Sequence, residues 1–439
     1  MPTRRPSARR IGLALAGGGP EGAVYEIGAL RALEEALDGI DFNDLDIYVG
    51  VSAGSFIAAC LANGLTTTQL VRAIVKHEPG QHPFVPKIFF TPAYGEVAKR
   101  ALMVPGLLAR ALWGAALRPG DLTLRESLVR LAEALPVGIF DNEPIRRFLA
   151  RVFSVRGRSD DFRRLRRRLI VVGADLGSGR AIRFGEGAWS HVPISRAVQA
   201  STAVPGVYPP VRIDGRDCVD GVLLKTLHAS IALEHGARLL LCVNPVVPVD
   251  TGPAVAAGAM GDGVLLEGGL PTTLNQTFRT LVHSRLEVGF ARYAAAYPGA
   301  DALLFEPERD EYGMFFTSIF SFSARRAVCE LGYRATRRDL WRRRRELAPV
   351  LRRHGVRLRP DVLADASRDL WTGVGLPEVN ERGPTDGLER ALARLEAAVG
   401  RPARSPSRRP PVPRPAAAAG GAPPAARRSR RGSPAPRRG

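Results

Sequence analysis

The sequence predicts an α/β protein, because two short apolar segments near its N-terminus each lead through a tight turn into a helix. Residues 11–16 are apolar and strand-like, residues 17–22 form a glycine-rich turn, and residues 23–37 carry a helical pattern. Residues 46–50 form the second apolar segment, and the helix-like residues 55–62 follow the turn after it. Further strand patterns lie at residues 169–174, 238–243 and 301–306.

The second of these turns places a serine where a nucleophile would be useful. Ser52 is the centre of Gly50-Val51-Ser52-Ala53-Gly54. A serine on a strand-to-helix turn needs small neighbours, because the backbone there is strained and crowded. The N-terminus of the following helix favours the negative charge that develops during attack. Glycine accounts for 46 residues of the chain, so the prediction depends on the strand-turn-helix context rather than on the pentapeptide alone.

Three interpretations of the glycine-rich turn at residues 17–22 are open from the residues alone. Its N–H groups precede a helix and would bind an anion, which could be a nucleotide phosphate, since Gly17, Gly19 and Gly22 fit G-x-G-x-x-G. They would equally serve as donors to the oxyanion of a tetrahedral intermediate. The third interpretation is a structural turn. A dinucleotide fold needs an acidic residue at the end of the next strand, and here that strand ends in the serine turn.

A carboxylate that could act on the serine lies much later in the chain. Asp220 ends a short strand pattern and precedes Gly221. At such a position it would orient or deprotonate a serine hydroxyl. The alternative is an Asp-Gly turn in which the carboxylate accepts from its own backbone.

Together these segments resemble the patatin-like phospholipase family. The matching elements are the G-G-G-x-x-G turn at residues 17–22, the G-x-S-x-G turn at residues 50–54, the A-S-T-A-x-P-G-x-x-P-P run at residues 200–210 and the Asp220-Gly221 pair. The order and spacing of these motifs fit the family.

The resemblance implies a three-layer α/β/α sandwich with a central, mostly parallel sheet. It implies a dyad in which Ser52 is the nucleophile and Asp220 is the general base, with no histidine, metal or organic cofactor. The oxyanion donors would be backbone N–H groups of Gly17, Gly18, Gly19 and Ala53. The other motif glycines are Gly22, Gly50, Gly54 and Gly221.

The chain departs from the family pattern at two places. Many members carry Arg or Lys in the glycine-rich turn, where this chain has Pro20 and Glu21. Proline lacks an N–H and glutamate repels phosphate, so phospholipids and neutral lipids are both open as substrates. Val222 follows the Asp-Gly pair, where small residues are usual.

A conventional triad is the alternative to the dyad, because histidine is the usual base in acyl transfer. The order serine, acid, histidine would be satisfied by Ser52, Asp220 and either His228 or His283.

Composition and charge divide the chain into regions. The net charge is +20, and residues 401–439 hold eleven arginines and no acidic residue. This segment is predicted to be a disordered tail that either aids solubility or contacts anionic lipid. It contains no aromatic residue, so specific binding of nucleic acid is not indicated. The predicted regions are a hydrolase domain at 10–345 with a helical insert or lid at 66–168, a helical extension at 346–400 and the tail at 401–439.

The sequence therefore predicts a serine hydrolase of lipid acyl esters, either a phospholipase A or lysophospholipase or a neutral-lipid esterase. The apolar segments 88–113 and 314–322 are candidates for transient contact with a membrane. No signal peptide or membrane-spanning run is seen, and the expected location is cytoplasmic, peripheral at the inner membrane face. The alternatives are a non-catalytic membrane-associated scaffold on a hydrolase fold, and a phosphate- or nucleotide-binding protein. The oligomeric state is not indicated.

Overall fold

The computed structural model describes residues 10–75, 86–117, 134–258, 260–311 and 322–376. These residues belong to one compact unit. The arginine-rich segment 401–439 and residues 314–321 of the aromatic segment lie outside the described residues, so what the sequence predicts for them stays a prediction.

An eight-stranded sheet forms the core of the fold. Strands β11, β10, β1, β3 and β6 are neighbours in that order and run parallel. Beyond β6 the sheet continues with antiparallel β9 and β8, and β7 also pairs with β6. The strands are β1 (Ile11–Leu15), β3 (Ile47–Val51), β6 (Arg168–Asp175), β7 (Ala181–Phe184), β8 (Val211–Ile213), β9 (Arg216–Asp220), β10 (Leu239–Val243) and β11 (Asp301–Phe305).

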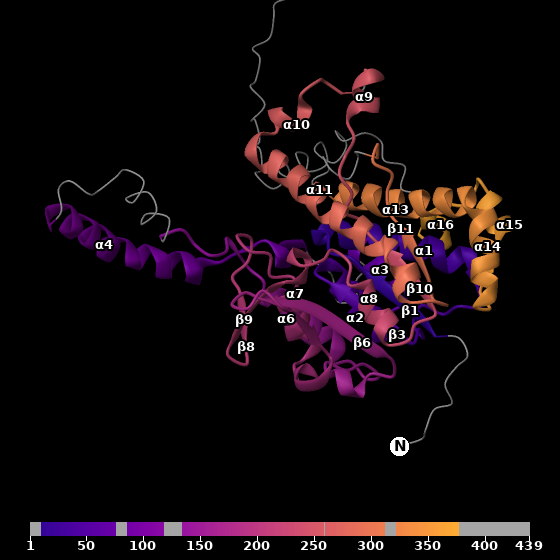
Figure 1. Cartoon of the computed structure of the whole chain (residues 1–439), viewed down its shortest axis with the longest axis horizontal. Coiled ribbons are helices and arrows are strands. Elements are labelled where there is room, and N and C mark those ends of the chain that lie inside the picture. Colours follow the sequence, from indigo (N-terminus) through magenta and orange to yellow (C-terminus); the bar gives the residue numbers. More distant parts are fainter. Residues whose placement is uncertain (1–9, 76–85, 118–133, 259, 312–321, 377–439) are drawn as a thin grey trace, which may run out of the picture. The chain divides into compact units, whose positions relative to one another are not determined.

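Helices cover both faces of the sheet, which confirms the three-layer α/β/α arrangement (Figure 1). Successive side chains of a strand point to opposite faces. Leu13 and Leu15 therefore enter one core, and Ala14 enters the other. The first core is covered by α1 (Gly19–Ala36), α2 (Ala53–Ala62), α7 (Ile194–Ser201) and α13 (Phe322–Arg342). The second is covered by α8 (Ala229–Glu234) and α11 (Gly269–Ala291), and the short helices α9 (Gly252–Ala256), α10 (Val264–Glu267) and α12 (Tyr293–Ala296) flank α11 in sequence.

Helices α1 and α13 approach each other closely at two glycines. A Cβ added at Gly28 would lie 1.9 Å from the Cys329 carbonyl oxygen, and one added at Gly332 would lie 2.2 Å from that of Tyr25. Any side chain at these positions would push the helices apart. The glycines thus set the distance between α1, which begins at the glycine-rich turn, and the late helix α13.

The chain after α13 returns to the N-terminal half. β12 pairs antiparallel with β2, and Arg72 Nη2 donates to the Val374 carbonyl at 2.7 Å. Residues 346–376, which the sequence assigns to an extension, thus lie in the same compact unit as the sheet. The elements are β2 (Leu37–Asp38), α14 (Arg344–Arg353), β12 (Arg357–Leu358), α15 (Pro360–Ala364) and α16 (Leu370–Gly373).

The described part of the insert at 66–168 is largely helical. It contains α3 (Thr67–Val75), η1 (Pro86–Phe89), β4 (Thr91–Pro92), α4 (Tyr94–Leu117), β5 (Phe140–Asp141), α6 (Glu143–Phe153) and η2 (Phe162–Arg164). Two contacts fasten it to the loop after α7. The Tyr208 hydroxyl donates to the Phe89 carbonyl at 2.7 Å, and the Ile139 N–H donates to the Val207 carbonyl at 3.0 Å. Short 3₁₀ turns η3 (Gly187–Trp189) and η4 (Gly221–Leu223) complete the described elements.

Candidate active site

Ser52 forms the turn between β3 and α2 with a strained backbone. Its φ is 50° and its ψ is −123°, a conformation that residues with a side chain rarely adopt. The Ser52 N–H donates to Ser201 Oγ at 2.9 Å, and Ser201 Oγ in turn donates to the Val172 carbonyl at 2.6 Å. Ser201 belongs to the run at residues 200–210, and the sequence alone did not assign it this supporting role.

The glycines on either side of Ser52 are needed for space. A Cβ at Gly50 would lie 2.5 Å from Ser55 Cα, and one at Gly54 would lie 2.5 Å from the Leu15 carbonyl group. Both neighbours are backbone atoms, which cannot move aside without displacing β1 or α2. The G-x-S-x-G pattern therefore reflects close contact of the serine elbow, residues 50–54, with the start of α2 at Gly50 and with the end of β1 at Gly54.

Strand register brings Asp220 to the level of Ser52. Val51, the last residue of β3, pairs with Val172 of β6. The next residue of β6, Gly173, pairs on its other side with Asp220 at the end of β9. The ends of β3 and β9 thus meet at the same height on β6, although 168 residues separate Ser52 from Asp220 in sequence.

Asp220 is fully buried, and burial raises its pKa from 3.8 to about 7. A hydrogen bond with the Ser52 side chain and one from the Val222 N–H oppose this rise. Val222 N–H donates to Oδ1 at 2.9 Å, whereas Oδ2 has no hydrogen-bond partner of ordinary geometry within the described residues. The Ser52 hydroxyl is thus near the carboxylate without being well aligned with it. Such loose alignment is common before substrate binds.

Three backbone N–H groups are free near Ser52. For Gly18, Gly19 and Ala53, no acceptor is found in the part of the chain that the structure describes. Gly17 differs, because its N–H donates to the Thr226 carbonyl at 3.2 Å. Of the four residues named from the sequence as oxyanion donors, Gly17 is therefore engaged in holding the turn.

Glu21 lies in the first turn of α1, close to these N–H groups in sequence. Burial raises its pKa to about 7, and the positive charge of Arg279 on α11 opposes this rise. Glu21, the acidic residue that distinguishes this turn from the family pattern, is therefore partly removed from solvent. The positive charge of Arg279 partly compensates its negative charge.

Neither candidate histidine directs its recorded contacts to Ser52 or Asp220. His228 is buried with its Nε2 3.4 Å from the Gly221 carbonyl, and burial lowers its pKa to about 4. His283 Nε2 lies 3.4 Å from Glu306 Oε1.

A cavity of about 200 Å³ opens beside Ser52. Its walls come from α1, α2, the insert and the loop after α7, and they are almost entirely apolar. The lining residues are Gly19, Pro20, Ala23, Val24, Ser52, Ala53, Phe56, Phe89, Phe90, Ile145, Thr202, Val204, Val207 and Tyr208. The sequence suggested the insert as a lid but did not identify Phe56, Ile145 or Tyr208, which no local pattern marks.

The chain is similar to two curated proteins whose names state no activity. An uncharacterised NTE family protein of Mycobacterium bovis is 25% identical over 244 residues, and one of Mycobacterium tuberculosis is 24% identical over 241 residues. Each alignment covers 55% of this chain and 31% of the relative, so the chain spans about a third of the length of the curated relatives it matches.

Solved structures that align with the chain are distant. VipD from Legionella pneumophila is 15% identical, with 76% of this chain and 68% of that chain covered and a TM-score of 0.32. The type III effector ExoU is also 15% identical, with 75% and 52% covered and a TM-score of 0.30. TM-scores this low support no inference about mechanism.

The family model described as patatin-like phospholipase matches residues 13–233, about half of the chain. The matched region runs from the first strand through the glycine-rich turn and the serine elbow to beyond Asp220. This chain therefore belongs to the patatin-like phospholipase family, a family of lipid acyl hydrolases.

Proposed function

We propose that this chain hydrolyses acyl esters of lipids with Ser52 as nucleophile and Asp220 as general base. The observation that carries the proposal is the strained elbow at Ser52 next to a fully buried carboxylate whose pKa lies near neutrality. A general base works best when its pKa is close to the working pH. Burial therefore supplies what a histidine supplies in a conventional triad.

Acyl transfer at this site follows from the arrangement. Ser52 Oγ forms a bond to the ester carbonyl carbon while its proton passes to Asp220. The carbonyl oxygen becomes an oxyanion, and the free N–H groups of Gly18, Gly19 and Ala53 are its proposed donors. When the bond to the alcohol oxygen breaks, Asp220 returns the proton to that oxygen. Water then attacks the acyl-enzyme, gives its proton to Asp220, and releases the acid as Ser52 regains a proton.

The apolar cavity supports a lipid acyl chain as the group that is transferred. Each methylene moved from water into such a cavity contributes about 0.8 kcal/mol. A small polar acyl group would leave the apolar wall unfilled. The partly buried Glu21 near the turn disfavours a phosphate at the ester, so we propose neutral lipids over phospholipids.

We also propose that the enzyme contacts a membrane transiently through α11. Between Gly269 and Ser284 its only ionisable residues are Arg279 and His283, and both are buried. The outward side of this segment carries Leu270, Leu274, Phe278 and Leu281, all exposed. None of the described helices is long and apolar enough to cross a bilayer. This uncharged surface, on which exposed apolar side chains alternate with exposed Thr and Asn, suits contact with the surface layer of a membrane.

Helix α11 adjoins the proposed catalytic residues. Thr226 Oγ1 donates to the Val282 carbonyl at 3.3 Å, and Arg285 donates to the Leu223 carbonyl at 3.3 Å. Leu223 is three residues from Asp220. A bilayer against α11 would therefore bring lipid to the edge of the sheet where Ser52 lies.

Covalent labelling tests the nucleophile. The intact chain should react with a fluorophosphonate at Ser52, as located by peptide mass spectrometry, and Ser52→Ala should take no label. Ser55→Ala is the matched control, since Ser55 Oγ only donates to the Ser52 carbonyl at 2.6 Å. Absence of label from the folded wild-type chain would favour the non-catalytic scaffold, and label on another residue would place the nucleophile elsewhere.

A further inference from the structure

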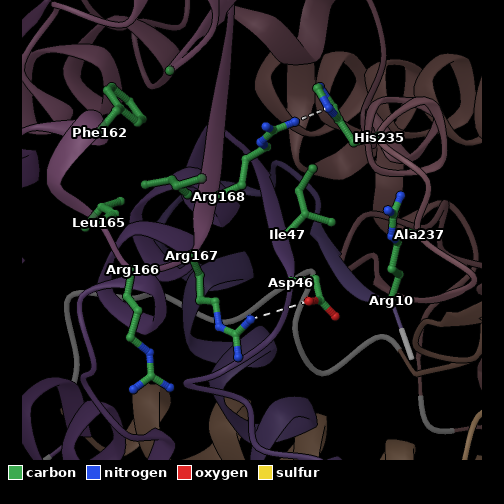
Figure 2. A pocket seen from close by; sticks show the side chains of 12 residues that line it. Arg10, Asp46, Ile47, Phe162, Leu165, Arg166, Arg167, Arg168, His235 and Ala237 are labelled. Carbon is green, nitrogen blue, oxygen red and sulfur yellow. Dashed lines mark hydrogen bonds and ion pairs between the residues drawn. The ribbon is translucent and has the colours of Figure 1, made fainter. Parts of the chain in front are cut away.

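A second and larger hollow, of about 530 Å³, lies at the opposite edge of the sheet. Its lining residues stand where the parallel strands begin: Arg10 before β1, Asp46 before β3, Arg168 at the start of β6 and Ala237 before β10 (Figure 2). Ser52 follows the far end of β3, a strand of five residues. At about 3.3 Å per residue the two sites are roughly 17 Å apart.

The wall of this hollow is strongly basic. Four arginines line it, at positions 10, 166, 167 and 168, against a single acidic residue, Asp46. Two of the four are neutralised by a neighbouring carboxylate. Arg166 and Arg167 both bind Asp44, whose pKa they lower to about 2, and Arg167 Nη1 also lies 3.4 Å from Asp46. These two arginines thus hold the start of β6 against the loop before β3.

Arg168 has a different partner. Its Nη1 contacts Nδ1 of His235, as Figure 2 shows. The other ring nitrogen of His235, Nε2, contacts Oε1 of Glu186. The imidazole ring therefore lies between Arg168 and the carboxylate of Glu186. Arg168 makes no direct ion pair among the residues the structure describes.

Arg10 contacts Gly236, the residue that follows His235 in the turn after α8. A Cβ built at Gly236 would come within 2.5 Å of Arg10 Nη1, so the guanidinium rests on the Gly236 backbone. Gly236 has a φ of +83°, which favours glycine and leaves this space open. Within the described residues no carboxylate pairs with Arg10. Arg168 and Arg10, which have no carboxylate partner among the described residues, thus contact the consecutive residues His235 and Gly236.

We propose that Arg10 and Arg168 form a binding site for a phosphoryl anion, separate from the ester-hydrolysing site. Both side chains line the same hollow, so an anion bound there would be attracted by two positive charges. Guanidinium forks match the oxygens of a phosphoryl group and bind them in pairs. The hollow has room for a group attached to the phosphate. That group is either a lipid, with the phosphate as its head group, or a soluble phosphate ester.

Site-resolved protection tests the proposal on the full-length chain without any substitution. Phenylglyoxal modifies accessible arginines, and peptide mass spectrometry locates the products. Inorganic pyrophosphate at constant ionic strength should slow the modification of Arg10 and Arg168 at least several-fold. Arg357 is exposed and paired with Asp38, so its rate should stay constant. Equal rates at Arg10 and Arg168 with and without millimolar pyrophosphate would overturn the proposal.

Matched variants give a second measurement. Arg10→Gln and Arg168→Gln should each weaken pyrophosphate binding in calorimetry about tenfold, as expected for loss of one charge-assisted fork. Arg357→Gln removes the same charge and should change the affinity less than twofold. Equal weakening in all three variants would mean that only net charge matters and would contradict a built site.

Vesicles distinguish the two sources of the phosphate. If the ligand is a lipid head group, wild type should prefer phosphatidic acid vesicles to phosphatidylglycerol vesicles of equal charge, and the double variant Arg10→Gln, Arg168→Gln should lose that preference. If it is a soluble ester, vesicle binding should be the same for both proteins while pyrophosphate protection persists. Fluorophosphonate labelling of Ser52 should be unchanged in the double variant, so failure here is distinct from failure of the proposed hydrolase.

Discussion

At Ser52 the fold maintains a backbone conformation that costs of order 1–3 kcal/mol for a residue with a side chain. Two hydrogen bonds hold this backbone conformation in place. The Ser52 N–H donates to Ser201 Oγ, and the Gly54 N–H donates to the Ala16 carbonyl at 3.0 Å. Both contacts come from segments distant in sequence. The strain therefore persists only in the assembled sheet.

Replacement of Asp220 should separate the dyad from a triad. Asp220→Asn removes the proposed base and should lower turnover of a soluble ester by roughly 10²-fold or more. His228→Ala should retain most turnover, because the His228 ring contacts the Gly221 carbonyl and not the proposed dyad. Steady-state kinetics of both folded variants would check this. An inactive His228→Ala beside an active Asp220→Asn would contradict the dyad.

The same carboxylate should make stability depend on pH. Its pKa is about 7 when folded and 3.8 when unfolded, so between these values the folded chain holds a proton that the unfolded chain has lost. The contribution of Asp220 to the free energy of unfolding is therefore full below pH 3.8. It is lost as pH rises from there through 7, and the loss is at most about 4 kcal/mol. The Asp220→Asn variant should lack this pH dependence, because an asparagine side chain does not titrate.

The melting temperature of Asp220→Asn relative to wild type should accordingly rise between pH 5 and pH 8 in thermal unfolding. Substitution also changes the hydrogen bond to the Val222 N–H, but that adds a constant offset at all pH values. A difference that does not vary with pH would show that the carboxylate is not desolvated as the structure indicates.

At the scale of elements, the catalytic edge is built from strand ends and helix starts that must approach closely. Helix α1 begins at the glycine-rich turn, and its position is set by contact with α13 at Gly28 and Gly332. A late helix thus supports an early turn. The position of the free N–H groups of Gly18 and Gly19 consequently depends on residues more than 300 positions away.

Gly28→Ala should therefore destabilise the fold by about 2–4 kcal/mol, since a Cβ there would overlap the Cys329 carbonyl. Gly289→Ala is the matched control in α11, because no atom lies within 4 Å of the added Cβ. That change should be neutral or stabilise by up to about 1 kcal/mol, from the helix propensity of alanine. Denaturant unfolding would measure both. Equal stabilities for the two variants would mean that the helices separate at little cost.

At the scale of the whole described unit, the two edges of the sheet differ in chemistry. The carboxyl ends of the parallel strands adjoin Ser52, the apolar cavity and the uncharged side of α11. The amino ends adjoin the arginine-lined hollow. An enzyme that takes lipid from a membrane would present the first edge to the bilayer.

Leu274→Ser should weaken binding to zwitterionic vesicles by about three- to tenfold, because partial insertion of a leucine into the interface contributes only about half of the roughly 1.5–3 kcal/mol of full burial. Leu176→Ser is the control, since Leu176 is 56% exposed and Leu274 is 57% exposed. Zwitterionic lipid limits the electrostatic contribution of the arginine-rich tail. Vesicle sedimentation would measure binding, with turnover of a soluble ester expected to stay constant. Equal binding by both variants would exclude α11 as the contact surface.

The sequence by itself determined the strands that carry the motifs, the three-layer α/β class and the family. These depend on local patterns: apolar runs that end in glycine turns, and short motifs whose spacing is constrained by sterics. Glycines 50 and 54 are recognisable because any side chain there would collide with backbone, so the requirement appears in the residues themselves.

Only the tertiary structure decided which polar groups act on one another. The pairing of Asp220 with Gly173, the engagement of the Gly17 N–H by Thr226 and the support of Ser52 by Ser201 all join residues far apart in sequence. Likewise, Arg10 and Arg168 line one hollow because β1 and β6 begin at the same edge of the sheet. Desolvation and hydrogen bonding act over a few ångströms in space, and a linear pattern does not specify which distant segments come within that distance.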